Sequence, residues 1–67
     1  MKRRDFLRQL KVMAEEKGLD FKVNKKRGKG SHYWVQVGAR GTTVPERLTR
    51  AICKAILKQL DLDGNQD

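Results

Sequence analysis

The spacing of apolar residues changes along this chain from a helical period to an alternating period and back again. Between Arg3 and Lys17 apolar side chains recur every three or four residues, which predicts an amphipathic helix that ends at Gly18. Residues 46–60 show the same spacing and predict a second amphipathic helix. The two apolar stripes consist of Phe6, Leu7, Leu10, Met13, Ala14, Leu48, Ile52, Cys53, Ile56, Leu57 and Leu60. Each helix therefore needs a surface that covers its stripe.

The middle third alternates apolar and polar residues, as β-strands with one buried face do. Residues 19–24 and 31–37 predict two strands, and residues 42–44 predict a third that pairs with the second in a hairpin. In the central strand Val35 and Val37 are the natural core residues, together with Tyr33. His32, Trp34 and Gln36 are then expected on the opposite face.

These elements predict an α+β fold in the order α-β-β-β-α, a three-stranded antiparallel sheet with both helices on one face. A chain of 67 residues has room for one small domain, which we expect over residues 1–62. The sequence becomes polar from Asp61 onward, and residues 63–67 are expected to form a flexible polar tail. The other face of the sheet is left open.

The charge balance indicates the class of partner. Sixteen Lys and Arg residues against eight Asp and Glu give a net charge of +8, which favours a polyanion such as RNA. No apolar run approaches the roughly 20 residues that span a bilayer, so we expect a cytoplasmic protein with no membrane partner. With one cysteine and no metal-ligand spacing, we expect neither a disulfide nor a metal, and no cofactor.

Basic residues gather in two places. The segment 25–30 contains Lys26, Arg27 and Lys29, which are candidates to attract RNA phosphates. On the wheel of the second predicted helix one basic face lies opposite the apolar stripe, and it consists of Arg47, Arg50, Lys54 and Lys58. A basic helix face is also typical of an ordinary solvated surface. Together, the two clusters favour a nucleic-acid partner.

Glycines interrupt the first basic cluster just before the central strand. Backbone N–H groups near Gly30 and Ser31 could cradle a single phosphate, although an ordinary flexible turn is an equal alternative. The spacing differs from that of a P-loop, and here the segment joins strand to strand.

His32, the only histidine, follows this segment and precedes Trp34, the only tryptophan. An imidazole in a basic field on a rigid strand suits general acid/base chemistry on RNA, where a 2′-hydroxyl can attack its own phosphate. A lone histidine on an exposed strand position is otherwise often incidental. Trp34 suits stacking on a base, or alternatively packing on a partner protein.

The chain resembles the HicA toxins of HicA–HicB toxin–antitoxin pairs over residues 3–62. The segments that carry this resemblance are "RRDFLRQLKVMAEEKGLDF", "GSHYWVQV", "TTVP" and "AICKAILKQLDL". The resemblance implies a double-stranded-RNA-binding-domain-like fold and a translation-blocking ribonuclease that cleaves mRNA with its strand histidine and is neutralised by a HicB-type antitoxin. Many members carry a second histidine where this chain has Tyr33, and a longer connection after the Val-Pro pair that here ends at Pro45.

The leading hypothesis is therefore a metal-independent endoribonuclease of low turnover with His32 as its catalytic residue. A non-catalytic RNA-binding module would use the same cations, with Trp34 as a stacking platform. A structural subunit whose open sheet face contacts another protein is the third hypothesis.

Overall fold

Two helices and three strands follow one another in the predicted order. The computed structural model describes residues 2–26 and 32–62, so the tail predicted over 63–67 lies outside the described residues. The elements are α1 (Arg3–Glu16), β1 (Phe21–Asn24), β2 (Tyr33–Val37), β3 (Arg40–Val44) and α2 (Arg50–Gln59). The α-β-β-β-α order is confirmed.

The strands form one antiparallel sheet with β2 in the centre. Val23 pairs with Val35, which in turn pairs with Thr42, and this row lies on one face of the sheet. The first strand begins two residues later than predicted, because the N–H of Leu19 still bonds to the Ala14 carbonyl at the end of α1. Gly38 and Ala39 form the tight turn between β2 and β3.

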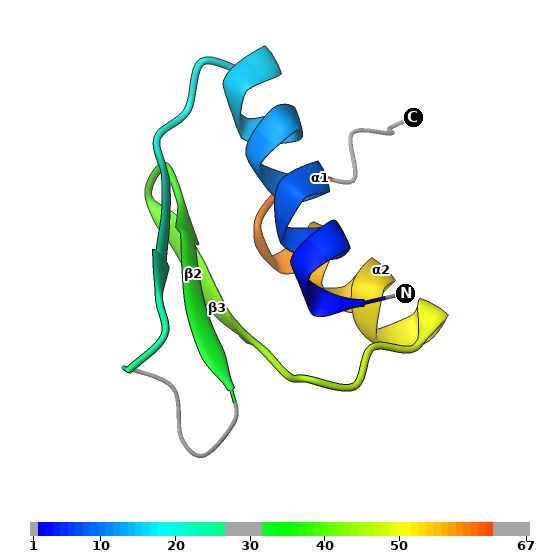
Figure 1. Ribbon diagram of the computed structural model, residues 1–67. Helices are drawn as coiled ribbons and strands as arrows, with labels where there is room; N and C mark the ends of the chain where they lie inside the picture. Colours follow the sequence, from blue (N-terminus) through cyan, green and yellow to red (C-terminus); the bar gives the residue numbers. More distant parts are fainter. Residues whose placement is uncertain (1, 27–31, 63–67) are drawn as a thin grey trace.

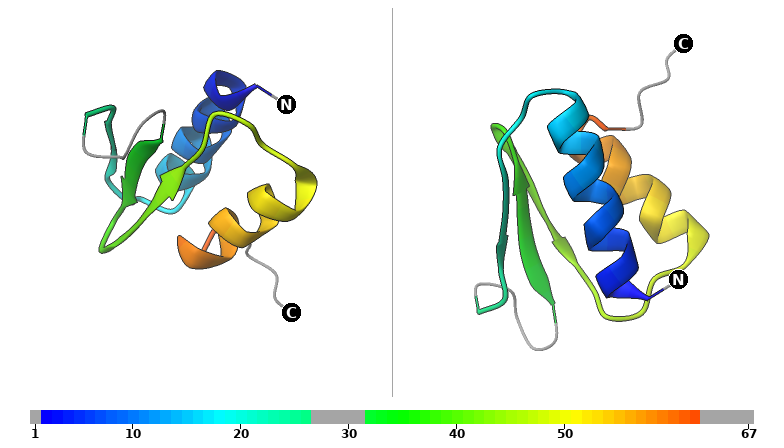
Figure 2. Two further views of the ribbon diagram at one scale, coloured as in Figure 1. Left: turned by 90° about the horizontal axis from the view of Figure 1, so that it is seen from below. Right: turned by 45° about the horizontal axis from the view of Figure 1, so that its top comes forward.

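Both helices cover the same face of the sheet, as expected (Figures 1 and 2). Helix α1 lies nearest β1, and α2 lies nearest β3. The residues buried between the two layers are Phe6, Leu10, Ala14, Val35, Val37, Val44, Ile56, Leu60 and Leu62. Most of the remaining predicted stripe, including Cys53, packs against them partly buried. The predicted core is therefore largely confirmed.

The start of α2 differs from the prediction of a helix over residues 46–60. The helix begins at Arg50, and Thr49 is its extended N-cap residue, whose Oγ1 accepts a hydrogen bond from the N–H of Ile52 at 3.2 Å. A threonine is strongly favoured in this capping position, so the cap outweighs the apolar periodicity that continues upstream. Arg47 consequently lies outside the helix and forms an antiparallel bridge with Lys2.

The end of α2 also differs from the prediction, because Leu62 is buried although it lies in the stretch from Asp61 onward that the sequence predicts to be polar. Asp61 adopts a left-handed conformation with φ of 59°. The chain then turns back, and the N–H of Leu62 donates to the Leu57 carbonyl at 2.8 Å. This is a Schellman-type helix end, in which the residue after the turn packs against the helix. Across the described parts of the chain, no helix combines the length and the hydrophobicity that a membrane crossing requires.

Candidate nucleic-acid interface

Basic residues from distant parts of the chain line one pocket near the start of α1. The pocket is lined by Lys2, Arg3, Arg4, Leu7, Lys25, Tyr33 and Glu46. We call its four cations, Lys2, Arg3, Arg4 and Lys25, the basic end. Through its bridge with Lys2, Arg47 lies beside this cluster. Cations at a helix N-terminus oppose the helix dipole, so the arrangement concentrates positive potential at some cost to helix stability.

Tyr33 forms the floor of the basic end. The guanidinium carbon of Arg3 lies 3.6 Å from the centre of the Tyr33 ring, and the Lys25 ammonium lies 5.8 Å from it. These are cation–π distances, which hold both cations over the aromatic face. Tyr33 contacts α1 on the helix-covered side, as the alternation predicts, but it is only half-buried and is not one of the core residues expected together with Val35 and Val37, because its ring packs under cations and not among apolar side chains.

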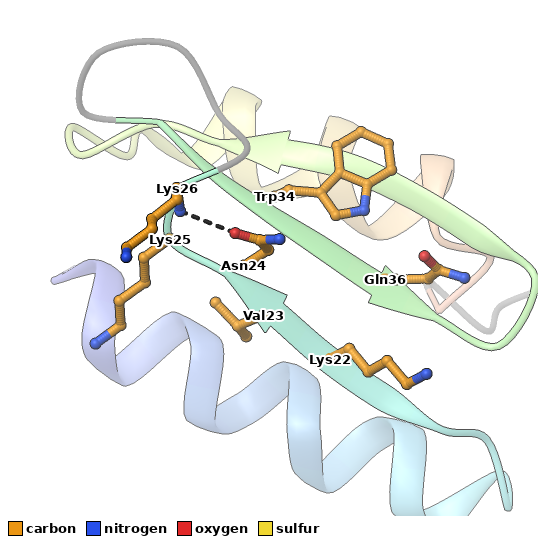
Figure 3. Close-up of a pocket in the computed structure, with 7 residues that line it drawn as sticks. All are labelled: Lys22, Val23, Asn24, Lys25, Lys26, Trp34 and Gln36. Atoms are coloured by element: carbon orange, nitrogen blue, oxygen red, sulfur yellow. Dashed lines mark hydrogen bonds between the residues drawn. The ribbon is translucent and has the colours of Figure 1, made fainter.

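The open face of the sheet carries a second cationic surface (Figure 3). A groove of about 630 Å³ runs over β1 and β2 and is lined by Lys22, Val23, Asn24, Lys25, Lys26, Trp34 and Gln36. We call it the sheet groove. Three of these lining residues are lysines and none is acidic, so the groove favours an anion. Lys25 lines both the sheet groove and the pocket of the basic end.

Local hydrogen bonds hold the polar side chains of the sheet groove. The backbone N–H of Lys26 donates to Asn24 Oδ1 at 2.9 Å, which stabilises the turn after β1. At the other end, Gln36 Nε2 donates to the Gly38 carbonyl at 3.3 Å. The antiparallel register places Asn24 beside Trp34, and Lys22 beside Gln36. Alternate residues of the two strands, Lys22 and Asn24 of β1 with Trp34 and Gln36 of β2, thus form the open-face part of the groove, and Val23 and Lys25 complete its edge.

The candidate catalytic residue, His32, is exposed and lies one residue before β2. It precedes Tyr33 of the basic end and is two residues from Trp34 of the sheet groove. The segment that precedes it holds Arg27, Lys29, Gly30 and Ser31, and these predicted phosphate-binding residues lie outside the described part of the chain.

The structure brings some of the predicted binding residues together and separates others. Lys26 and Trp34 both line the sheet groove. Arg50 and Lys54 are exposed on α2, and Arg50 lines a different pocket, between the two helices. The predicted ridge of four cations on one helix face is wrong for Arg47, because that residue precedes the helix.

Sequence reasoning missed several cations that the fold gathers. Lys22 could have been found, because strict alternation with Phe21 and Val23 puts it on the face of Trp34. Arg3 and Arg4 carried no such signal, because their approach to Tyr33 depends on how α1 packs on the sheet. Among the residues that the structure describes, no group of three or more His, Cys, Asp or Glu side chains is placed to hold a metal ion.

Comparison of the chain with models of known protein families, with curated proteins and with solved structures finds no match.

Proposed function

We propose that this chain is an RNA-binding endoribonuclease with His32 as its catalytic residue. The observation that supports it is the position of an exposed histidine at the start of the central strand, next in sequence to Tyr33 of the basic end and close to Trp34 of the sheet groove. Two cationic surfaces that share Lys25 favour an RNA strand that passes this point. On such a path the phosphates of the bound RNA pass close to His32, and general acid/base catalysis requires the imidazole to be near the reacting atoms.

In the proposed reaction, the imidazole of His32 removes the proton from a ribose 2′-hydroxyl. The 2′-oxygen attacks the adjacent phosphorus, the bond from phosphorus to the 5′-oxygen breaks, and the leaving oxygen takes a proton from the imidazolium or from water. The products are a 2′,3′-cyclic phosphate and a 5′-hydroxyl. Lysine and arginine side chains stabilise the charge that develops on the phosphate oxygens. One acid/base group supplies about 10² to 10⁴-fold in rate, so a slow enzyme is expected.

Replacing His32 with alanine tests this function. We expect cleavage of single-stranded RNA to fall by at least about 10²-fold, while RNA binding stays nearly unchanged because the lysines and Trp34 remain. Products are identified by their cyclic phosphate ends, and a substrate with 2′-deoxyribose at the cleaved position is the matched chemical control. The assignment is wrong if the variant cleaves as fast as the original chain, or if the deoxy substrate is cut.

We further propose that the cellular role is that of the toxin in a type II toxin–antitoxin pair, which acts on mRNA in the cytoplasm and is neutralised by a HicB-type antitoxin. The support is the resemblance of residues 3–62 described above, together with the α-β-β-β-α order. Induced expression should arrest growth and shorten mRNA, and the His32→Ala variant should do neither. Growth arrest by the variant with intact mRNA would contradict this role.

The sheet groove also supports a second candidate function, a non-catalytic RNA-binding module. Its lining residues offer three lysines and an aromatic ring, which suffice for binding without any acid/base group. Tight RNA binding by the original chain without cyclic phosphate products would favour this function over the enzyme.

A further inference from the structure

We propose that the sheet groove is a site for an unpaired nucleotide, whose base packs against Trp34 and whose flanking phosphates contact Lys22 and Lys26. This inference rests on the proposed function in taking RNA as the ligand, and it adds that the substrate is single-stranded at this site.

Trp34 packs closely against the neighbouring strand. Its indole lies against Gly41 of β3, and a Cβ atom at position 41 would lie 3.0 Å from Cε2 and overlap Cζ2. The indole Nε1 is buried, although the side chain as a whole is only partly so. A large aromatic ring on the face away from the helices contributes nothing to the core between sheet and helices. Because this packing already restricts the ring, little conformational entropy is lost when a base packs on it.

The groove beside Trp34 matches a nucleotide in size and in charge. Its volume of about 630 Å³ falls within the range of about 300 to 1,000 Å³ typical of small-ligand sites. Lys22 and Lys26 lie toward opposite ends of the groove, with Trp34 and Gln36 on its other side (Figure 3). An aromatic side chain and several lysines along one groove is the combination with which proteins bind single strands, by base stacking and by phosphate contacts.

A duplex cannot use this aromatic side chain. In an A-form helix the faces of the bases are stacked on one another, and proteins reach mainly phosphates, 2′-hydroxyls and base edges in the shallow groove. Only an unpaired base offers its face to a side chain. The amide of Gln36, which lines the same groove, can add a hydrogen bond to a base edge. The chemistry of the groove therefore favours a loop or single strand over a helix.

The single tryptophan makes the site directly observable. The full chain with His32→Ala, which prevents cleavage, is titrated with a synthetic single-stranded RNA, with the same RNA annealed to its complement, and with a strand in which abasic riboses replace the nucleotides. We expect quenching of Trp34 fluorescence by the single strand, with about tenfold or weaker affinity for the duplex and for the abasic strand. The measurement is repeated with the unaltered chain and a 2′-O-methyl strand, which cannot be cleaved by the proposed reaction.

Two variants separate stacking from charge. Trp34→Leu should weaken single-strand binding by about tenfold, measured by anisotropy of a labelled RNA, and Trp34→Phe should recover part of the loss. Lys22→Gln should weaken binding, and the number of counterions released, measured from the salt dependence of the affinity, should fall by about one. Lys11→Gln, which makes the same charge change on the exposed side of α1, is the matched control and should have a smaller effect. Thermal unfolding of each variant verifies that it is folded.

The inference is overturned if saturating single-stranded RNA leaves the fluorescence unchanged, or if duplex binds as tightly and quenches as much. Its failure is distinct from failure of the enzyme. If RNA is cleaved but Trp34 fluorescence does not respond, the nucleotide site is rejected and the ribonuclease function stands. If RNA quenches Trp34 but no cyclic phosphate products form, the nucleotide site stands and the ribonuclease function is rejected. If the chain does not bind RNA at all and a protein partner binds this face, both proposals are rejected.

Discussion

The two faces of β2 differ in what they contribute. On the side toward the helices, Val35 and Val37 are 0% and 1% exposed and form the centre of the core. On the other side, Trp34 and Gln36 are partly exposed and line a groove with three lysines. One strand thus contributes alternate residues to folding and to a surface suited to a ligand. Substitutions on the helix-covered face should therefore lower stability, and substitutions on the open face should weaken ligand binding.

The largest expected effect on stability comes from the helix-covered face. Val35→Ala removes two buried methyl groups and leaves a small cavity, so the free energy of unfolding should fall by about 2 to 3 kcal/mol, measured in urea. Thr43→Ala on the open face should change it by less than about 0.5 kcal/mol, because that side chain is exposed. An equal loss of unfolding free energy in both variants would contradict the claim that only the helix-covered face contributes to the core.

Gly41→Ala tests the packing of the open face. The new methyl group would overlap the indole of Trp34, so the ring must move, at a cost of about 1 to 3 kcal/mol in unfolding free energy. Tryptophan emission should shift to the red as the indole becomes more exposed, and single-strand binding should weaken. In a Trp34→Leu background the same substitution should cost much less. A loss of equal size in both backgrounds would show that the close contact is unimportant.

The boundary between the two faces can be tested at Tyr33. Arg3→Met keeps an unbranched, flexible side chain and removes the cation–π contact, so the free energy of unfolding should fall by about 0.5 to 1 kcal/mol. Arg8→Met, on an exposed position of the same helix, is the matched control. A double-mutant cycle with Tyr33→Leu should give a coupling energy for Arg3 and none for Arg8. Equal coupling for both arginines would contradict the contact.

The smallest effect is expected at the end of α2. Asp61 has φ of 59°, a conformation that glycine adopts without strain, so Asp61→Gly should stabilise the fold by about 0.5 kcal/mol. Gly18 has φ of 70° at the end of α1, and Gly18→Ala should therefore destabilise it by about 1 kcal/mol. Calorimetry measures both. Neither substitution should alter the quenching of Trp34 by RNA, since both residues lie in the helical layer. Altered quenching in either variant would contradict the independence of the two faces.

Much of the fold was predictable because each element carries its own periodic pattern. The stripe through Phe6 and Leu10 and the alternation through Val35 each indicate one buried face, and the structure confirms them. The start of α2 was not predictable from periodicity, because the cap at Thr49 is a local hydrogen bond that an apolar pattern does not report. Leu62 was missed for a similar reason, since the single left-handed residue Asp61 turns the chain back so that Leu62 packs against the helix.

The candidate site was predictable only in part. His32, Trp34 and Lys26 stand out from the sequence by rarity and by charge. Alternation alone puts Lys22 on the face of Trp34, but its position beside Gln36 depends on the register between β1 and β2, which is a property of the assembled sheet. Arg47 is not part of the basic face predicted on α2; it lies instead beside Lys2 at the basic end.

Two amphipathic helices, the alternating strands, the excess of positive charge and the outward side of Trp34 can all be inferred from the order of the amino acids. Those properties follow from spacing and composition, which are local. Only the tertiary structure decided that Arg3 lies over Tyr33, that Trp34 lies against Gly41, and that Lys25 lines both cationic surfaces. The contact of Arg3 with Tyr33 joins residues far apart in the chain and depends on how helix and sheet pack, whereas the contact of Trp34 with Gly41 depends on the register of the β2–β3 hairpin; no local pattern encodes either one.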